Sequence, residues 1–161
     1  MKKVDINQAI ALLANIGVIV SLVFVGEQVR QSAQATRTAT IFELKNAWLD
    51  VNLALATNPD LAMALTDVNA SGWEASASVS KIQVGAFYRS MIHNWSTGYY
   101  QYRQGTLDDE QWAPYLRQMK IDARDPVMRR IWSDWRFIYD DEFQALVDGY
   151  MAKAANAAAA D

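Results

Sequence analysis

The chain has 161 residues, no cysteine, and 15 Lys and Arg against 18 Asp and Glu, which give a formal net charge of −3 at pH 7. The lack of cysteine excludes disulfides, thiolate metal sites and cysteine nucleophiles, and no basic patch for nucleic acid stands out along the sequence. Only seven Gly and three Pro occur, so the composition favours helices throughout.

An apolar stretch, residues 9–25 (AIALLANIGVIVSLVFV), contains no charged side chain and only two polar ones, Asn15 and Ser21. A helix of this length spans about 26 Å, and its flanking residues extend it to the roughly 30 Å of a bilayer's hydrocarbon core. We therefore predict one membrane-spanning helix, with residues 1–26 as a membrane anchor.

Two other interpretations of this stretch stay open. A signal peptide would start at Lys2 and Lys3, but its candidate cleavage site, residues 33–35, lies about ten residues beyond Val25, farther than usual. An uncleaved anchor is therefore favoured. A buried helix of a soluble protein is the other alternative, because the stretch is short for a span.

Small residues share one face of the predicted span. Ala14, Gly17 and Ser21 are spaced by three and four residues, a loose form of the small-xxx-small pattern that lets a second helix approach closely. Asn15 lies beside this face, where its amide can hydrogen-bond across the contact. We predict a helix–helix contact in the membrane through these four residues, either with a second copy of the chain or with another protein.

The helical pattern continues after Gly26. Apolar or small residues recur every three or four positions as far as Leu55, and the first proline is Pro59. This periodicity predicts one helix from about Ile6 to about Ala56, in which residues 27–57 form a helical stalk.

Three further helices are predicted at residues 59–68, 78–104 and 106–121. Another is predicted to open at Asp125-Pro126, and a last one to follow a cap at Asp140 or Asp141. Gly105 is expected to adopt a left-handed conformation at a helix end, and Thr106 to cap the next helix. Residues 58–153 then form a helical bundle domain, and the Ala-rich residues 154–161 a loose tail. The predicted fold is all-α: an N-terminal transmembrane helix that continues into a long stalk, packed with a small antiparallel helical bundle.

Candidate chemistry is sparse. His93 is the only histidine, which excludes a two-histidine metal site, and we interpret it as a hydrogen-bonding residue in or beside the bundle rather than as a haem or chlorophyll ligand. The acidic triplets at 108–110 and 140–142 stand at predicted helix starts, where carboxylates satisfy free N–H groups. We therefore predict capping there and no metal site, catalytic residue or cofactor.

Aromatic residues concentrate between residues 87 and 150, and most should fill the core of a small bundle. Some can remain for a partner or ligand surface. The candidates for that surface are Tyr88, Trp95, Tyr99, Trp112, Arg129, Arg130, Trp132 and Trp135.

Two segments of the chain resemble those of a known protein family. One is residues 29–37, with Val29-Arg30-Gln31 and Ala35-Thr36-Arg37, and the other is residues 99–108, which read YYQYRQGTLD. With them the chain resembles a family of small bacterial membrane-anchored proteins that share an apolar N-terminal helix, a long helical continuation and an aromatic turn before a Trp-bearing helix. The family has no established activity. The resemblance implies this architecture and a bacterial inner-membrane setting.

These features lead to a functional hypothesis. We expect a membrane-anchored, non-enzymatic interaction protein that serves as an accessory or scaffolding subunit. It would form a homo-oligomer or belong to a larger membrane complex. We expect it to contact membrane lipid and not to bind nucleic acid. An alternative is a membrane-anchored small-molecule sensor whose aromatic helices enclose a pocket. Lys2, Lys3 and the α-amino group before the span, against Arg30 and Arg37 after it, slightly favour a helical domain in the periplasm.

Overall fold

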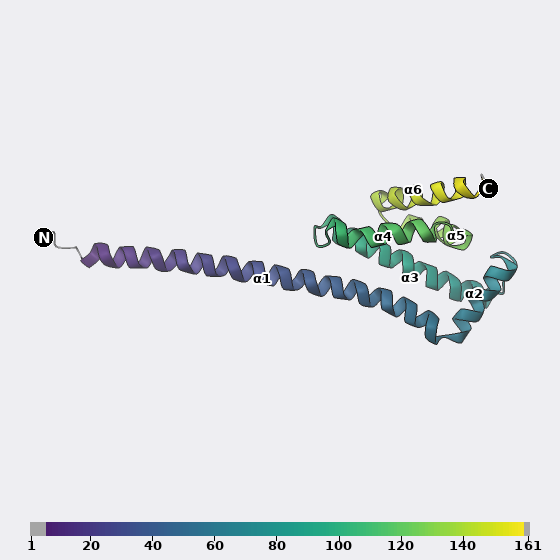
Figure 1. Ribbon diagram of the computed structural model, residues 1–161, viewed down its shortest axis with the longest axis horizontal. Coiled ribbons are helices and arrows are strands. Elements are labelled where there is room, and N and C mark those ends of the chain that lie inside the picture. Colours follow the sequence, from purple (N-terminus) through teal and green to yellow (C-terminus); the bar gives the residue numbers. More distant parts are fainter. Residues whose placement is uncertain (1–5, 160–161) are drawn as a thin grey trace. The chain divides into compact units, whose positions relative to one another are not determined.

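The structure, a computed structural model, describes residues 6–159, with side chains from Ile10 onwards. The described part of the chain is all-α and contains no strand (Figure 1). Its elements are α1 (Ile6–Thr57), α2 (Pro59–Ser71), α3 (Ser78–Arg103), α4 (Asp109–Asp122), α5 (Pro126–Trp135), a 3₁₀ turn η1 (Arg136–Ile138) and α6 (Asp141–Ala158). The chain divides into two units, residues 1–40 and 41–161.

In the first unit, α1 is the single described element, and the predicted uninterrupted helix is confirmed. This helix is long and apolar enough to cross a membrane, and none of its most apolar window is buried. The large apolar side chains between Ile10 and Val25 are 48–68% exposed. Taken by itself, the unit therefore carries an apolar surface along this part of α1.

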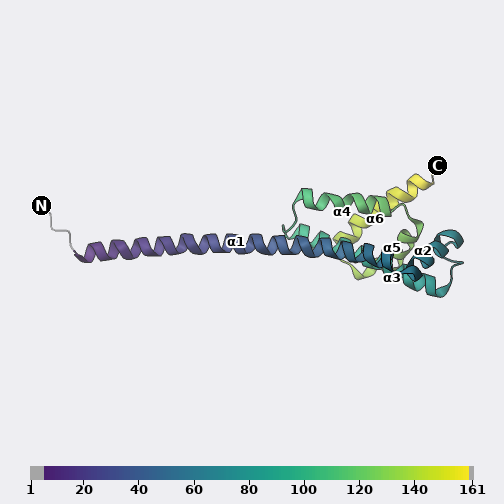
Figure 2. The ribbon, with the colours of Figure 1, turned by 60° about the horizontal axis from the view of Figure 1, so that its bottom comes forward.

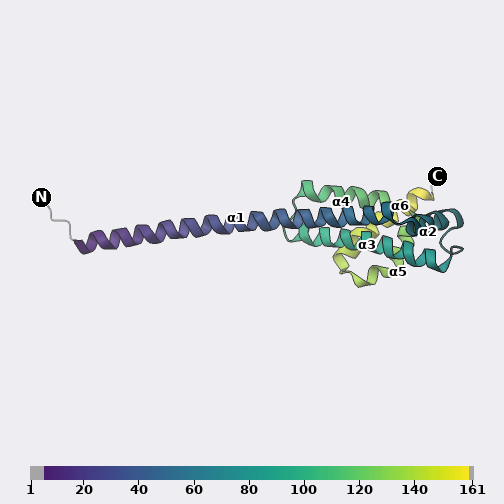
Figure 3. The same cartoon turned by 90° about the horizontal axis from the view of Figure 1, so that it is seen from below.

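In the second unit, α3 is the central helix and contacts α2, α4 and α5. Figure 2 shows α2 beside the first turns of α3, and Figure 3 shows α3 between α4 and α5. Leu44 of α1 is buried in the same core as Ile92 and Trp95 of α3. The last part of the predicted stalk, residues 41–57, therefore belongs to the bundle.

Side-chain caps start α2, α4, α5 and α6. The Asn58 side chain accepts hydrogen bonds from the backbone N–H groups of Asp60 and Leu61 at 3.0 and 3.2 Å. Asp125 accepts from Val127 N at 2.7 Å, and the predicted helix start at Asp125-Pro126 is confirmed. Asp140, rather than Asp141, caps α6.

Two predictions at helix ends were wrong. Asp108, not Thr106, caps α4: its side chain accepts from Gln111 N at 2.9 Å, and the Gln111 side chain accepts from Asp108 N at 3.1 Å. This reciprocal capping box satisfies two free N–H groups, whereas a hydroxyl at Thr106 satisfies one at most. The Ala-rich segment predicted to be loose is helical as far as Ala158, because alanine has the highest helix propensity and Ala154 packs against the core.

Glycine has a packing role at Gly98 of α3. A Cβ there would lie 2.7 Å from Tyr115 Cε1 and 3.0 Å from Tyr115 Cδ1, so the tyrosine ring of α4 rests on the glycine backbone. Gly149 of α6 also lies inside a helix, but a Cβ there would meet nothing within 4 Å.

We expect opposite results from alanine at these two positions. Gly98→Ala should lower the free energy of unfolding by about 1–3 kcal/mol, because the added methyl group overpacks against Tyr115. Gly149→Ala should raise it by about 0.5–1 kcal/mol, because alanine loses less backbone entropy in a helix. Urea unfolding of the full chain in a mild detergent measures both, and equal shifts would contradict the close approach at Gly98.

Candidate functional site

The first candidate site is the small-residue face of α1. Ala14, Asn15, Gly17 and Ser21 are all exposed, and a Cβ at Gly17 would meet nothing within 4 Å. The Ser21 hydroxyl donates to the Gly17 carbonyl at 2.8 Å. This bond satisfies the serine donor within the helix.

Polar contacts begin directly after the apolar stretch. Arg30 forms an ion pair with Glu27 at 2.8 Å, and the Gln31 amide donates to the same carboxylate at 3.1 Å. The pKa of Glu27 is lowered, chiefly because Arg30 donates hydrogen bonds to its charged form. This first polar turn marks the end of the apolar surface on α1.

The second candidate is the aromatic set in the bundle. Tyr88, Trp95, Tyr99 and Trp112 are all buried, with Trp95 fully so. Trp112 is stacked between Tyr102 and Tyr115, at ring-centroid distances of 5.5 and 5.2 Å. These rings therefore belong to the hydrophobic core, where they pack against other side chains.

Phe143 of α6 joins the two halves of this aromatic core. Its ring centroid lies 5.4 Å from that of Tyr99, 5.9 Å from that of Trp132 and 5.3 Å from that of Tyr139, and the side chain is fully buried. The helical pattern predicts that Phe143 lies on the last helix, but it does not indicate that this residue lies at the centre of the core.

The candidate surface on α5 divides into structural and exposed residues. Trp132 is buried, and its indole N–H donates to Asp148 at 2.8 Å. Arg129 donates to the carbonyls of Ala123 and Arg124, at the end of α4. Arg130 is exposed and pairs with Asp134 and Glu74. Trp135 is 37% exposed, with the Arg89 guanidinium 4.4 Å above its ring.

The distinctive segment 99–108 fastens α3 to the start of α6. Tyr99 donates to Glu142 at 3.3 Å, Arg103 forms an ion pair with the same carboxylate, and Tyr100 donates to Asp140. The pKa of Asp140 is lowered, chiefly by the hydrogen bond from Tyr100. These acids therefore link the start of α6 to the end of α3, and the partners lie too far apart in sequence for periodicity to have found them.

A pair of carboxyl groups between α4 and α5 was missed by the sequence analysis. Tyr88 donates to Asp125, and the Gln118 amide donates to Asp122 at 2.8 Å. The second oxygen of Asp122 is buried without a hydrogen-bond partner among the described residues. Burial, together with the nearby charge of Asp125, raises the pKa of Asp122 to about 6.

We expect Asp122 to make the bundle less stable as pH rises from about 4 to 6. The folded protein keeps a proton that the unfolded chain, with an ordinary carboxyl pKa, releases in this range, so stability is lost on ionisation. Because the carboxyl is partly exposed, Asp122→Asn should raise the free energy of unfolding at pH 7 by only about 1–2 kcal/mol.

At pH 4 the same substitution should have almost no effect, since the parent carboxyl is then protonated in the folded state. Urea unfolding at both pH values measures the difference, with Glu43→Gln, an exposed carboxyl on α1, as the control. An equal gain at pH 4 and pH 7 would rule out the ionisation of Asp122 as the cause.

His93 is exposed on α3, and its backbone carbonyl accepts from the hydroxyls of Ser96 and Thr97 at 2.8 and 3.0 Å. Within residues 6–159, no group of three or more His, Asp or Glu side chains gathers where it could hold a metal ion. Comparison with protein-family models, with curated proteins and with solved structures finds no match for this chain.

Proposed function

We propose that this chain is a membrane-anchored, non-enzymatic interaction protein, an accessory or scaffolding subunit that assembles through α1. The observation that carries the proposal is the exposure of the apolar part of α1. From Ile10 to Val25 its large side chains are 48–68% exposed. The core helix of a soluble protein would bury one face of such a stretch.

Lipid is the partner that best covers this surface. Monomeric soluble proteins rarely expose contiguous apolar patches above a few hundred Å², and here apolar side chains surround the helix on all sides. A helix keeps all its backbone hydrogen bonds internal, which is the condition for crossing hydrocarbon. The internal bond of Ser21 to Gly17 meets the same condition for a side chain.

The proposed location is the bacterial inner membrane, crossed once, with the N-terminus in the cytoplasm and the bundle in the periplasm. Cytoplasmic flanks of a span carry an excess of Lys and Arg. Lys2 and Lys3, outside the described residues, precede the span, and Arg30 and Arg37 follow it.

Assembly through the small-residue face is the testable part of this function. Replacing both Gly17 and Ser21 by leucine should weaken self-association, or association with a partner subunit, by at least about tenfold, because the added side chains hold the helices apart. The measurement is the molar mass of the full chain and of any copurifying subunit across a dilution series in detergent.

Ile19→Leu with Val23→Leu is the matched control. These residues lie on the side of α1 opposite Gly17 and Ser21, since each residue turns the helix by about 100°. The control pair should leave the mass unchanged. An unchanged mass in the Gly17 and Ser21 variant would remove the small-residue face from the proposal and leave the anchor itself untouched.

A further inference from the structure

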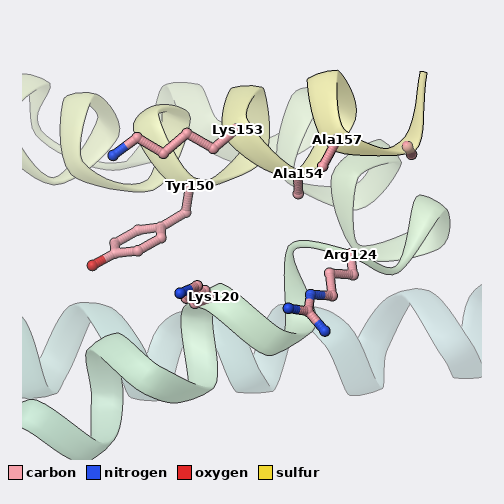
Figure 4. Close-up of a pocket in the computed structure, with 7 residues that line it drawn as sticks. Lys120, Arg124, Tyr150, Lys153, Ala154 and Ala157 are labelled. Carbon is pink, nitrogen blue, oxygen red and sulfur yellow. The ribbon is translucent and has the colours of Figure 1, made fainter. Parts of the chain in front are cut away.

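A groove runs between the C-terminal halves of α4 and α6, with a volume of about 720 Å³. Its lining includes Lys120 of α4, Arg124 of the turn that follows α4, and Tyr150, Lys153, Ala154 and Ala157 of α6. In Figure 4, Tyr150, Ala154 and Ala157 point from α6 toward α4, and Lys120 and Arg124 lie across the groove from them.

Among the residues that the structure describes, the lining carries three positive charges and no carboxylate. Lys120, Arg124 and Lys153 are exposed, and none of them forms an ion pair with an acid in the described part of the chain. This concentration contrasts with the chain as a whole, whose formal net charge is −3. Like charges that face one groove repel, and a bound anion would relieve that repulsion.

The end of α4 does not require these charges. Basic side chains near a helix C-terminus commonly satisfy its last carbonyls. Here Nη1 of Arg129 on α5 donates to the two carbonyls that directly follow α4, Ala123 O at 2.9 Å and Arg124 O at 2.8 Å. Lys120 and Arg124 are therefore not needed to satisfy these two carbonyls.

We propose that this groove binds the phosphate group of an anionic ligand. A guanidinium donates two parallel hydrogen bonds to phosphate oxygens, and ammonium groups contribute as compact charges. The Tyr150 hydroxyl adds a neutral donor. A phosphate offers more oxygens and more charge than a carboxylate, so it suits three cations and a phenol that come from α4, the turn after it and α6. The alanines of α6 leave room for the rest of the ligand.

Two sources can supply such a phosphate: the headgroup of an anionic phospholipid, or a soluble phosphorylated molecule. Amine acylation of the full chain, read by mass spectrometry, separates them. In the first arm, inorganic pyrophosphate is added to the protein in a nonionic detergent. In the second, no soluble phosphate is present, and nanodiscs of phosphatidylcholine are compared with nanodiscs that contain phosphatidylglycerol.

We expect Lys120 and Lys153 to be acylated at least about fivefold more slowly in one arm or both, while Lys45, exposed on α1, serves as internal reference and keeps its rate. Protection by pyrophosphate identifies a soluble source, and protection by phosphatidylglycerol alone identifies a lipid headgroup. Absence of protection in both arms, or equal protection of Lys45, overturns the proposal. The pyrophosphate arm does not depend on the membrane assignment.

A pair of variants tests whether the groove itself is responsible. Arg124→Gln should raise the concentration of pyrophosphate needed for half protection by at least about tenfold, or abolish the protection in phosphatidylglycerol nanodiscs. Arg117→Gln removes the same charge from an exposed position of α4 that does not line the groove, and should change neither. Equal effects of the two variants would assign the protection to general charge attraction.

Discussion

Replacing Phe143 by alanine should lower the free energy of unfolding of the bundle by about 3–5 kcal/mol, the usual cost of truncating a buried aromatic side chain. Phe143 is fully buried, and its ring contacts the rings of Tyr99, Trp132 and Tyr139, which come from α3, from α5 and from the segment before α6. Truncation leaves a cavity where three parts of the core meet. Urea unfolding followed by tryptophan fluorescence, in a mild detergent, measures the loss.

Phe137 provides the matched control within the same chain. It lies in η1 and is 73% exposed, so Phe137→Ala should change the free energy of unfolding by less than about 0.5 kcal/mol. If both substitutions cost the same, Phe143 does not stand at the centre of the core.

Two arginines in the apolar part of α1 should release the protein from the membrane. Moving an arginine to the centre of a span costs about 2.5–3.5 kcal/mol, and losing Ile or Val removes a small favourable contribution. Ile16→Arg with Val20→Arg should therefore disfavour insertion by about 6–8 kcal/mol. The measurement is the share of the protein in the membrane fraction, which should fall from nearly all to a small remainder.

The control places the same charges at the same spacing beyond the span. Gln31→Arg with Ala35→Arg alters exposed positions of α1 that follow the first polar turn, and should leave the membrane fraction unchanged. A parent-like distribution of the Ile16 and Val20 variant would mean that this stretch of α1 does not lie in hydrocarbon.

Helix starts were predictable because their cause is local. Asn58 before Pro59 and Asp125 before Pro126 satisfy free N–H groups within three residues, and proline fixes the backbone at the first helical position. The left-handed conformation of Gly105, with φ +73°, is local in the same way. Thr106 was predicted to cap α4, but Asp108, two residues further on, caps it instead. Asp108 and Gln111 form a reciprocal cap, which is stronger than a single hydroxyl.

The arrangement of side chains between helices could not be read from the sequence. Arg103 and Glu142 pair across the bundle, and Lys120 and Lys153 line one groove. Neither arrangement could be predicted, because periodicity shows only which residues share a face of one helix. The same limit left open whether the aromatic residues were core or surface. Trp132 is buried, whereas Trp135, one turn later on α5, is partly exposed.

Sedimentation of the intact chain tests the membrane anchor most directly. Bacterial membranes that contain the protein are washed with high salt and with alkaline carbonate, without detergent, and are then pelleted. If residues 9–25 cross the bilayer, the protein stays in the pellet after both washes and is extracted only by detergent. Full-length protein in the supernatant would contradict the anchor, and with it the proposed location and the assembly through α1.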